Sequence, residues 1–273
     1  MQWLLGLLLF FPMAVRADEP ENTLQVRLIS EVSSIAAGKK FYVGLHLQHP
    51  PNAHTYWKHP GIVGIATTVK WELPAGFTAA EIEWPAPQAV KMAGHEAQGY
   101  EGETLLMIPI TPPPKLVSNV VTLTAKVSWM CCGKTCQPAT DVPFSITLPV
   151  AESAEADIAT APLFDKFRNA VPRGSEGCKQ ITVHRGDGGI ILTLHPVYRR
   201  AYPFLTPAKI HFFTADGQVD SDQPQKIEMS AEGTITLTLT ASKTGPEQSE
   251  SLPGLVVIPT GKIPRLLEIN PRY

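Results

Sequence analysis

The stretch 121-VTLTAKVSWMCCGKTCQPATDVPFSITL-148 decides the fold. Apolar and polar residues alternate from Val121 to Trp129 and again from Val142 to Leu148, a period of two that is typical of strands with one buried face. The tripeptide GKT between Cys132 and Cys136 is short enough to reverse the chain. The stretch therefore predicts a β-hairpin with these two cysteines facing each other across its neck.

The spacing of the cysteines predicts a bond between Cys132 and Cys136. Facing residues of a hairpin lie about 4.5–5.5 Å apart at Cα, within the range that a disulfide needs. Cys131 points to the opposite face of its strand, because side chains alternate along a strand. A bridge across so small a loop adds little stability, so the cluster favours redox chemistry over an inert staple, which stays the alternative. Lys134 within the loop could favour a thiolate.

The same cysteines allow a different class of function. Thiolates and thioethers suit Cu(I), and imidazoles could complete such a site. A copper-binding or copper-tolerance protein is therefore the second hypothesis, although our principal interpretation needs neither a metal nor another cofactor. The soft ligands would be Met130, Cys131, Cys132 and Cys136, with His54, His59 or His95. Cys178 could bond to Cys131, or it could remain a small buried apolar residue.

Short alternating segments continue on both sides of the hairpin and predict an all-β protein. A change in composition at residues 151–175 divides the chain. This segment predicts a short helix that is capped by Thr160, has an apolar face of Leu163, Phe164 and Phe167, and ends at Pro172. We expect two immunoglobulin-like β-sandwich domains at residues 18–150 and 176–273, joined by this linker. The other strand candidates lie near residues 24–28, 42–47, 69–72, 105–110, 181–183, 190–194, 210–213, 235–239, 255–258 and 266–269.

The amino terminus and the charge bound the location and the partners. Residues 1–17 combine a short apolar run with small residues before a cleavage point, as in a signal peptide, and predict export to the periplasm. The formal charge of −2 and the absence of a basic run exclude nucleic acid as an expected partner. In an oxidising compartment, clustered cysteines pair unless a partner supplies electrons.

Several motifs occur in order between Leu24 and Leu148: HTYWKHPG at 54–61, TT at 67–68, WELPAG at 71–76, IEWPAP at 82–87, GYEG at 99–102 and VSW at 127–129. Together they resemble the amino-terminal periplasmic region of DsbD/ScsB-type thiol:disulfide interchange proteins. Weaker similarity continues through the helix and the second β-domain. The hairpin cysteines fall where that family carries its redox pair.

The resemblance implies an immunoglobulin-like domain that passes electrons through Cys132 and Cys136. The electrons would come from a membrane-embedded donor of the DsbD/CcdA type and go to periplasmic thioredoxin-fold oxidoreductases. Because the chain ends at Tyr273 without a transmembrane segment or a thioredoxin-like tail, we expect that donor to be a separate protein. By analogy with the family, we expect the downstream Cys136 to be the attacking nucleophile.

The resemblance also implies the surroundings of the pair. A capping loop over the cysteines would correspond to residues 92–101, which include His95 and Tyr100. His54 and Tyr56 fall where the family places ring-bearing residues, and with Tyr100 they would shape the pocket. Cys131 is an addition to the family pattern and, with Cys178, is a possible accessory thiol.

Overall fold

The computed structural model describes residues 23–175, 178–186, 189–197, 209–246, 248–260 and 263–273. The signal peptide expected at residues 1–17 lies outside the described residues. Within the described part of the chain, no helix has the length and hydropathy required to cross a membrane.

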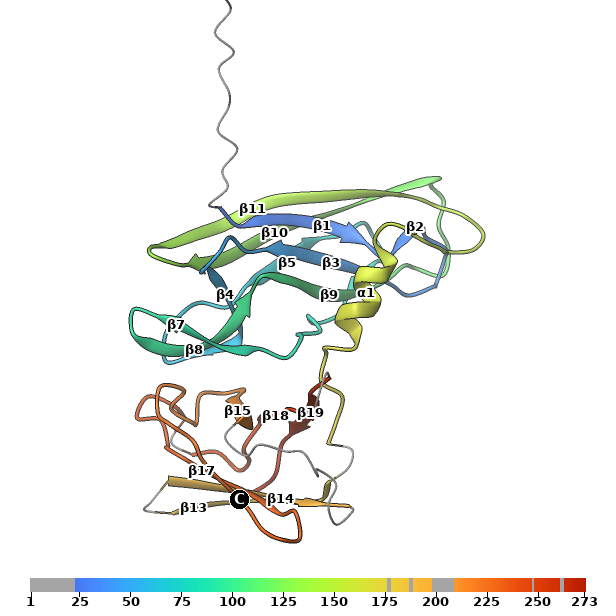
Figure 1. The fold of residues 1–273 in the computed structure, drawn as a ribbon. Helices are drawn as coiled ribbons and strands as arrows, with labels where there is room; N and C mark the ends of the chain where they lie inside the picture. The colour runs from blue at the N-terminus through green and yellow to red at the C-terminus, as the bar shows by residue number, and fades with distance from the viewer. Residues whose placement is uncertain (1–22, 176–177, 187–188, 198–208, 247, 261–262) are drawn as a thin grey trace, which may run out of the picture.

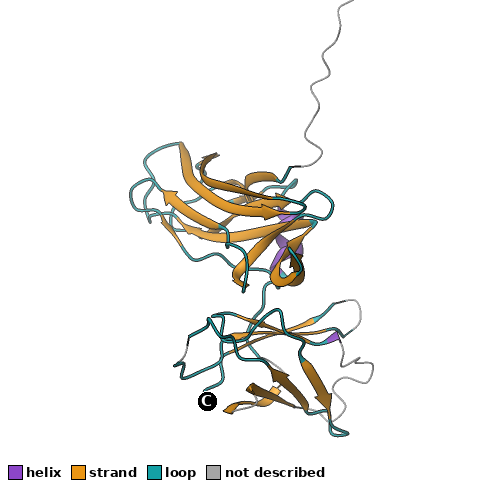
Figure 2. Ribbon diagram, turned by 90° about the vertical axis from the view of Figure 1, so that its left-hand side faces the viewer, coloured by secondary structure: helices purple, strands orange, loops and turns teal. Residues whose placement is uncertain are grey.

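The strands between Gln25 and Pro149 form the first domain, a sandwich of two antiparallel sheets (Figures 1 and 2). One sheet has the order β1-β3-β9-β6, with β1 at Gln25–Ser30, β3 at Phe41–Gln48, β9 at Glu103–Thr111 and β6 at Thr78–Ala79. The other has the order β11-β10-β4-β8-β7, and β5 also pairs with β10. Its strands are β11 at Cys136–Pro149, β10 at Val120–Cys132, β4 at His54–Gly61, β8 at His95–Glu101, β7 at Gln88–Met92 and β5 at Thr68–Glu72. A short pair, β2 at Val32–Ser34 and β12 at Glu155–Ala156, completes this part.

Strand β10 shows how the pattern builds the core of the first domain. Val121, Leu123, Ala125 and Val127 are all buried between the sheets, while the residues between them are exposed or half-buried. This confirms the predicted hairpin and its buried face. A bulge after Val127 shifts the register with β11, opposite the positive φ of Asp141.

The second domain, from residue 178 onward, also contains two antiparallel sheets and its own core. The sheets follow the orders β13-β14-β17-β16 and β15-β18-β19, so the all-β prediction is confirmed. The strands are β13 at Cys178–Gly186, β14 at Gly189–Pro196, β17 at Ile235–Leu239, β16 at Lys226–Met229, β15 at His211–Thr214, β18 at Gly254–Ile258 and β19 at Arg265–Ile269. The expected domain limits at residues 150 and 176 stay a prediction.

The helix α1, Ala161–Arg168, lies between the two domains in the chain and packs on β9 of the first. Phe164 and Phe167 are its buried residues, as the apolar spacing predicted. Thr160 occupies the N-cap position as predicted, but its side chain makes no capping hydrogen bond, because its hydroxyl donates to the carbonyl of Ser30 at 2.5 Å. The Asp157 carboxylate instead accepts the backbone N–H groups just before the helix.

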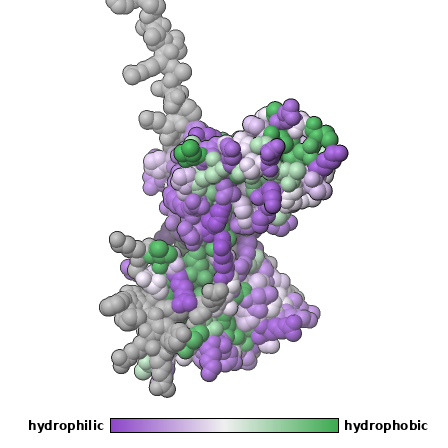
Figure 3. Space-filling model, turned by 90° about the vertical axis from the view of Figure 1, so that its right-hand side faces the viewer, coloured by the Kyte–Doolittle hydropathy of each residue, from purple (hydrophilic) through white to green (hydrophobic). Residues whose placement is uncertain are grey.

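The two domains contact each other through β4 and β8 of the first and β15 of the second. The rings of Trp57 and Phe213 meet edge to face with centroids 6.4 Å apart. The buried Gln98 amide donates to the Thr214 carbonyl and accepts the Thr214 N–H, both at 2.8 Å. Figure 3 shows hydrophobic side chains gathered near this junction, on the side that carries α1.

Candidate functional site

The site lies at the closed end of the β10–β11 hairpin, where Cys132 and Cys136 form a disulfide with an S–S distance of 2.02 Å. Their Cα atoms are 4.0 Å apart, somewhat closer than the 4.5–5.5 Å expected for facing strand residues. The tight turn brings them together, because the Gly133 N–H donates to the carbonyl of Thr135 at 3.0 Å.

The two sulfur-bearing residues differ in exposure. Cys132 has no exposed surface and packs in a small cluster with Tyr56, Val90 and Ala97. Cys136 is exposed. An incoming thiolate can therefore reach the Cys136 side of the bond, while the Cys132 side is covered.

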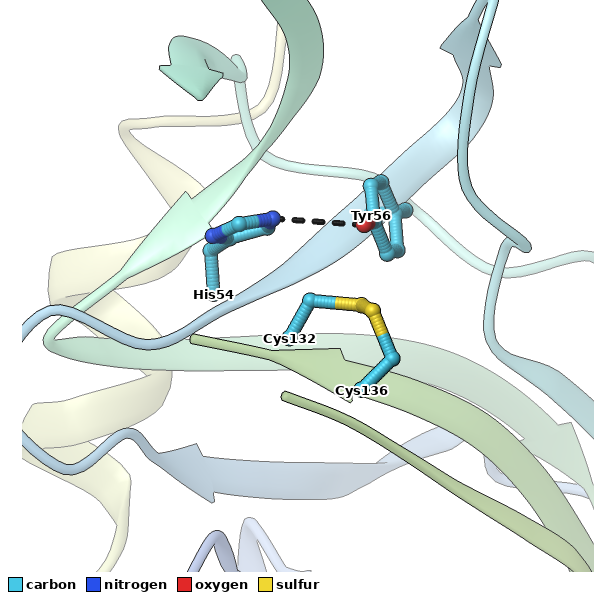
Figure 4. The surroundings of a disulfide bond; sticks show 4 residues. All are labelled: His54, Tyr56, Cys132 and Cys136. Carbon is cyan, nitrogen blue, oxygen red and sulfur yellow. Dashed lines mark hydrogen bonds between the residues drawn. A yellow bond between two sulfur atoms is a disulfide. The ribbon is translucent and has the colours of Figure 1, made fainter. Parts of the chain in front are cut away.

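His54 and Tyr56 of β4 form one wall beside the disulfide (Figure 4). The register places His54 directly opposite Cys132 on the neighbouring strand. The His54 Nε2 and the Tyr56 hydroxyl share a hydrogen bond of 3.2 Å, and the rings meet edge on with centroids 5.2 Å apart. Gly64 allows the following loop to lie against the Tyr56 ring, because a Cβ atom there would come within 2.2 Å of that ring.

Burial keeps both rings of this wall uncharged near neutral pH. Desolvation lowers the pKa of His54 below its ordinary value, against a smaller opposing effect of the Glu101 carboxylate. Desolvation also raises the pKa of Tyr56 to about 12, with a smaller contribution from Cys131. The wall therefore presents an apolar, hydrogen-bonded surface to the disulfide and places no ionic charge beside it.

The other wall is a β-hairpin where the family resemblance implied a capping loop. Strands β7 and β8 pair along their length and turn through Ala93 and Gly94, both at positive φ. Val90 and Ala97 point inward onto Cys132, and Met92 lies partly buried beside them. The alternation at 90–92 and 96–98 on either side of a glycine-containing turn is the sequence signal that could have identified this hairpin.

Tyr100 is not brought to the disulfide. It faces Thr55 across the β4–β8 pair, on the side opposite the face that carries Tyr56. Its ring is buried in the cluster of Leu45 and Trp57, and its hydroxyl donates to the carbonyl of Pro85 at 2.7 Å. Its contacts are therefore those of a core residue.

Comparisons with known proteins agree with this geometry. The family model described as "Thiol:disulfide interchange protein DsbD, N-terminal" matches residues 22–147. The first domain therefore matches the DsbD N-terminal family over nearly its whole length. The matched residues include both hairpin cysteines, His54 and Tyr56, so the site lies inside the DsbD-type domain.

A solved structure extends the likeness in fold to both domains. The crystal structure of the N-terminal periplasmic domain of ScsB from Proteus mirabilis has a TM-score of 0.62 and 18% identity, covering 93% of this chain and 96% of that one. A cohesin module from a Clostridium perfringens family 33 glycoside hydrolase covers 47% of this chain and 98% of its own, with 13% identity and a TM-score of 0.31. The comparison with curated protein sequences gives no match.

Within the DsbD-type domain, Cys131 is a free, buried thiol on the other face of β10. It lines a cavity of about 520 Å³ together with Lys134 and the loop at 50–53. Burial raises the pKa of the Cys131 thiol. The soft ligands considered for copper are thus divided between two faces of the hairpin, and no group of three or more His, Cys, Asp or Glu side chains in the described residues is arranged to hold a metal ion.

Cys178 is also a free thiol, and no disulfide joins it to Cys131. It begins β13 and packs, half-buried, against the core of the second domain. Burial raises its pKa, partly opposed by the charge of Arg265. Of the two alternatives for Cys178, a bond to Cys131 or a small apolar residue packed on the core, the structure shows the second.

Proposed function

We propose that this chain is a periplasmic thiol–disulfide exchange module that carries electrons through the Cys132–Cys136 pair. It would receive them from a membrane-embedded donor and deliver them to thioredoxin-fold oxidoreductases. One observation carries the proposal: a fully buried Cys132 is bonded to an exposed Cys136 at the tip of a DsbD-type domain. The family match and the periplasmic relative of the same fold support the location.

The loading half of the reaction begins at the exposed sulfur. A donor thiolate attacks Cys136 Sγ, the bond to Cys132 breaks, and Cys132 leaves as a thiolate that takes up a proton. The donor is now joined to Cys136 in a mixed disulfide. The donor's second thiolate attacks the donor sulfur in that bond and releases Cys136, so two electrons have moved to this chain and the donor has become a disulfide.

The delivery half reverses the roles of the partners. The Cys136 thiolate attacks the acceptor disulfide and forms a mixed disulfide, releasing one acceptor thiolate. Cys132 then gives up the proton it gained, and the acceptor thiolate released in the first exchange takes it up. The resulting Cys132 thiolate attacks Cys136 Sγ, re-forms the original bond and releases the second acceptor thiolate. Cys136 is the better site for a negative charge, because it meets water whereas Cys132 packs among apolar groups.

His54 and Tyr56 shape the surroundings of the exchange and do not transfer protons in this scheme. Both are neutral near pH 7, since burial lowers the pKa of one and raises the pKa of the other. Their edge-on packing holds a dry surface against the bond, which restricts approach to the side of Cys136.

The reduction potential of the pair tests the proposal. The full chain is equilibrated against glutathione or dithiothreitol buffers, and the Cys132–Cys136 bond is quantified by mass spectrometry. A potential of roughly −270 to −180 mV would suit an electron carrier between thioredoxin and the disulfide isomerases. A value below about −300 mV would identify a structural bond and contradict the proposal.

A trapping experiment tests the partner. Cys132→Ser leaves Cys136 without its resolving thiol, so a mixed disulfide with an oxidised thioredoxin-fold oxidoreductase should accumulate. Cys136→Ser should give little of that adduct, because Cys132 is covered. Cys178→Ser, which changes a thiol of the second domain, serves as the control and should react as the unmodified chain does.

A further inference from the structure

Two consecutive residues of the second domain, Ser221 and Asp222, form hydrogen bonds with the β7–β8 hairpin, which covers Cys132. One Asp222 carboxylate oxygen accepts the backbone N–H of Glu96 at 2.7 Å, and the other lies 2.7 Å from His95 Nδ1. These two hydrogen bonds hold the pKa of Asp222 below its ordinary value, so the group is a carboxylate at neutral pH. The Ser221 hydroxyl donates to the Glu96 carbonyl at 3.0 Å.

The same serine also holds the loop that follows β4. The backbone N–H of Ile62 donates to Ser221 Oγ at 3.2 Å. This close approach requires a glycine at position 61, where φ is +94° and a Cβ atom would come within 2.2 Å of the Ser221 oxygen. Ser221 therefore joins β8 and the end of β4, the two strands that form the walls beside the disulfide.

The hairpin is held from both sides. Its inner face places Val90 and Ala97 on Cys132, and its outer face and edge meet the second domain through Glu96 and Gln98. In Figure 1 the β7–β8 hairpin lies between the tip of β10–β11 and the loops of the second domain. A hairpin of two short strands has little stability by itself, so contacts on its outer side help to decide how often it leaves Cys132.

We propose that Ser221 and Asp222 are positioning residues that hold the β7–β8 hairpin over Cys132 and so direct incoming thiolates to Cys136. The second domain thereby selects which sulfur of the pair reacts. This inference rests on the proposed exchange function for its biological meaning. Its structural content, the protection of Cys132, can be measured independently of any partner.

The test measures how fast iodoacetamide alkylates Cys132 in the full chain. Cys136→Ser supplies the background, in which Cys132 is a thiol, and tandem mass spectrometry separates its labelling from that of Cys131. Asp222→Ala removes both carboxylate contacts and should speed Cys132 alkylation about tenfold, equivalent to about 1.4 kcal/mol of lost protection. Asp222→Asn keeps an oxygen for the Glu96 N–H and should restore most of the protection. Ser221→Ala deletes one atom and gives a second variant should Asp222→Ala fold poorly.

Two internal comparisons make the result decisive. Cys131 is buried on the other face of β10, so its labelling should stay constant when only the hairpin is released. Glu250→Ala changes an exposed acid of the second domain and should leave both rates unchanged. The inference would be overturned if the rate of Cys132 labelling in both Asp222→Ala and Ser221→Ala stayed within twofold of the background. It would also be overturned by an equal rise in labelling at Cys131 and Cys132, because that result reports general loosening of the domain. A reduction potential below about −300 mV would refute the exchange function but would leave this labelling result unchanged.

Discussion

Replacing Gln98 by leucine tests whether buried polar contacts hold the two domains together. The side chain lies on β8, almost fully buried, and its amide reaches into the second domain. It donates to the carbonyls of His59 and Thr214 at 2.6 and 2.8 Å and accepts the Thr214 N–H at 2.8 Å. Leucine has a similar size but can neither donate nor accept, so the substitution removes the hydrogen bonds while retaining apolar bulk.

The magnitude follows from the groups that lose their partner. Two carbonyls and one N–H would lose these bonds, and an unpaired buried group costs about 1–3 kcal/mol. The docked state of Gln98→Leu should therefore lose at least about 3 kcal/mol. Separation of the domains would return these groups to water, so the loss is limited by the free energy of docking. We accordingly expect the domains to come apart before either core unfolds.

Urea denaturation of the full chain measures this effect. Tryptophan fluorescence reports the interface through Trp57, which contacts Phe213, and circular dichroism reports the sheets. In Gln98→Leu the fluorescence transition should move to lower urea and separate from the transition seen by circular dichroism. Gln88→Leu, at an exposed position of the partner strand β7, is the matched control. Coincident transitions with less than about 1 kcal/mol of change would refute the reasoning.

Three further predictions concern pH, a close contact and the wall of the site. Burial lowers the pKa of His211 from 6.5 to about 4, so on acidification this imidazole takes up its proton at a higher pH in the unfolded chain than in the folded one. The free energy of unfolding should therefore fall by about 3 kcal/mol as the pH drops from 6.5 to 4. In urea titrations across that range, His211→Asn should flatten the decline, and a curve parallel to that of the unmodified chain would contradict the assignment. In thermal unfolding, Gly61→Ala should destabilise the chain by at least about 2 kcal/mol more than Gly102→Ala. Both glycines have positive φ, but only a Cβ atom at position 61 would meet Ser221 of the second domain. Equal losses of stability in the two variants would argue against that contact. Tyr56→Phe should cost about 1 kcal/mol and change the exchange rate with dithiothreitol less than threefold, whereas a loss of about a hundredfold would indicate proton transfer.

The sequence pattern was sufficient to predict those features in which one short segment both shows the pattern and forms the corresponding structure. The alternation around the cysteine hairpin predicted its strands, and the face rule placed Cys131 away from the bond between Cys132 and Cys136. The apolar spacing of Phe164 and Phe167 predicted the helix. These features depend on neighbours within a few residues, which the chain order itself provides.

The walls of the site required the tertiary structure. His54 and Tyr56 reach the disulfide only because β4 pairs beside β10, more than seventy residues further along the chain. The first four residues of β4 are all buried, so they carry no alternation that would mark a strand. Strand β8 is rich in polar residues, and two of them, Glu96 and Gln98, form hydrogen bonds with the second domain.

The same physical reason explains why the sequence did not predict the position of Tyr100 or the contacts of the second domain with the β7–β8 hairpin. Nothing near Tyr100 in sequence shows which face of β8 it occupies, and the pairing with β4 turned it into the core. Ser221 and Asp222 occupy an ordinary polar loop, and only domain packing brings them to Glu96, about 125 residues earlier. The sequence alone determined which two cysteines are bonded and which strands carry them. The tertiary structure decided which sulfur is covered and what covers it, because burial depends on contacts between segments far apart in the chain.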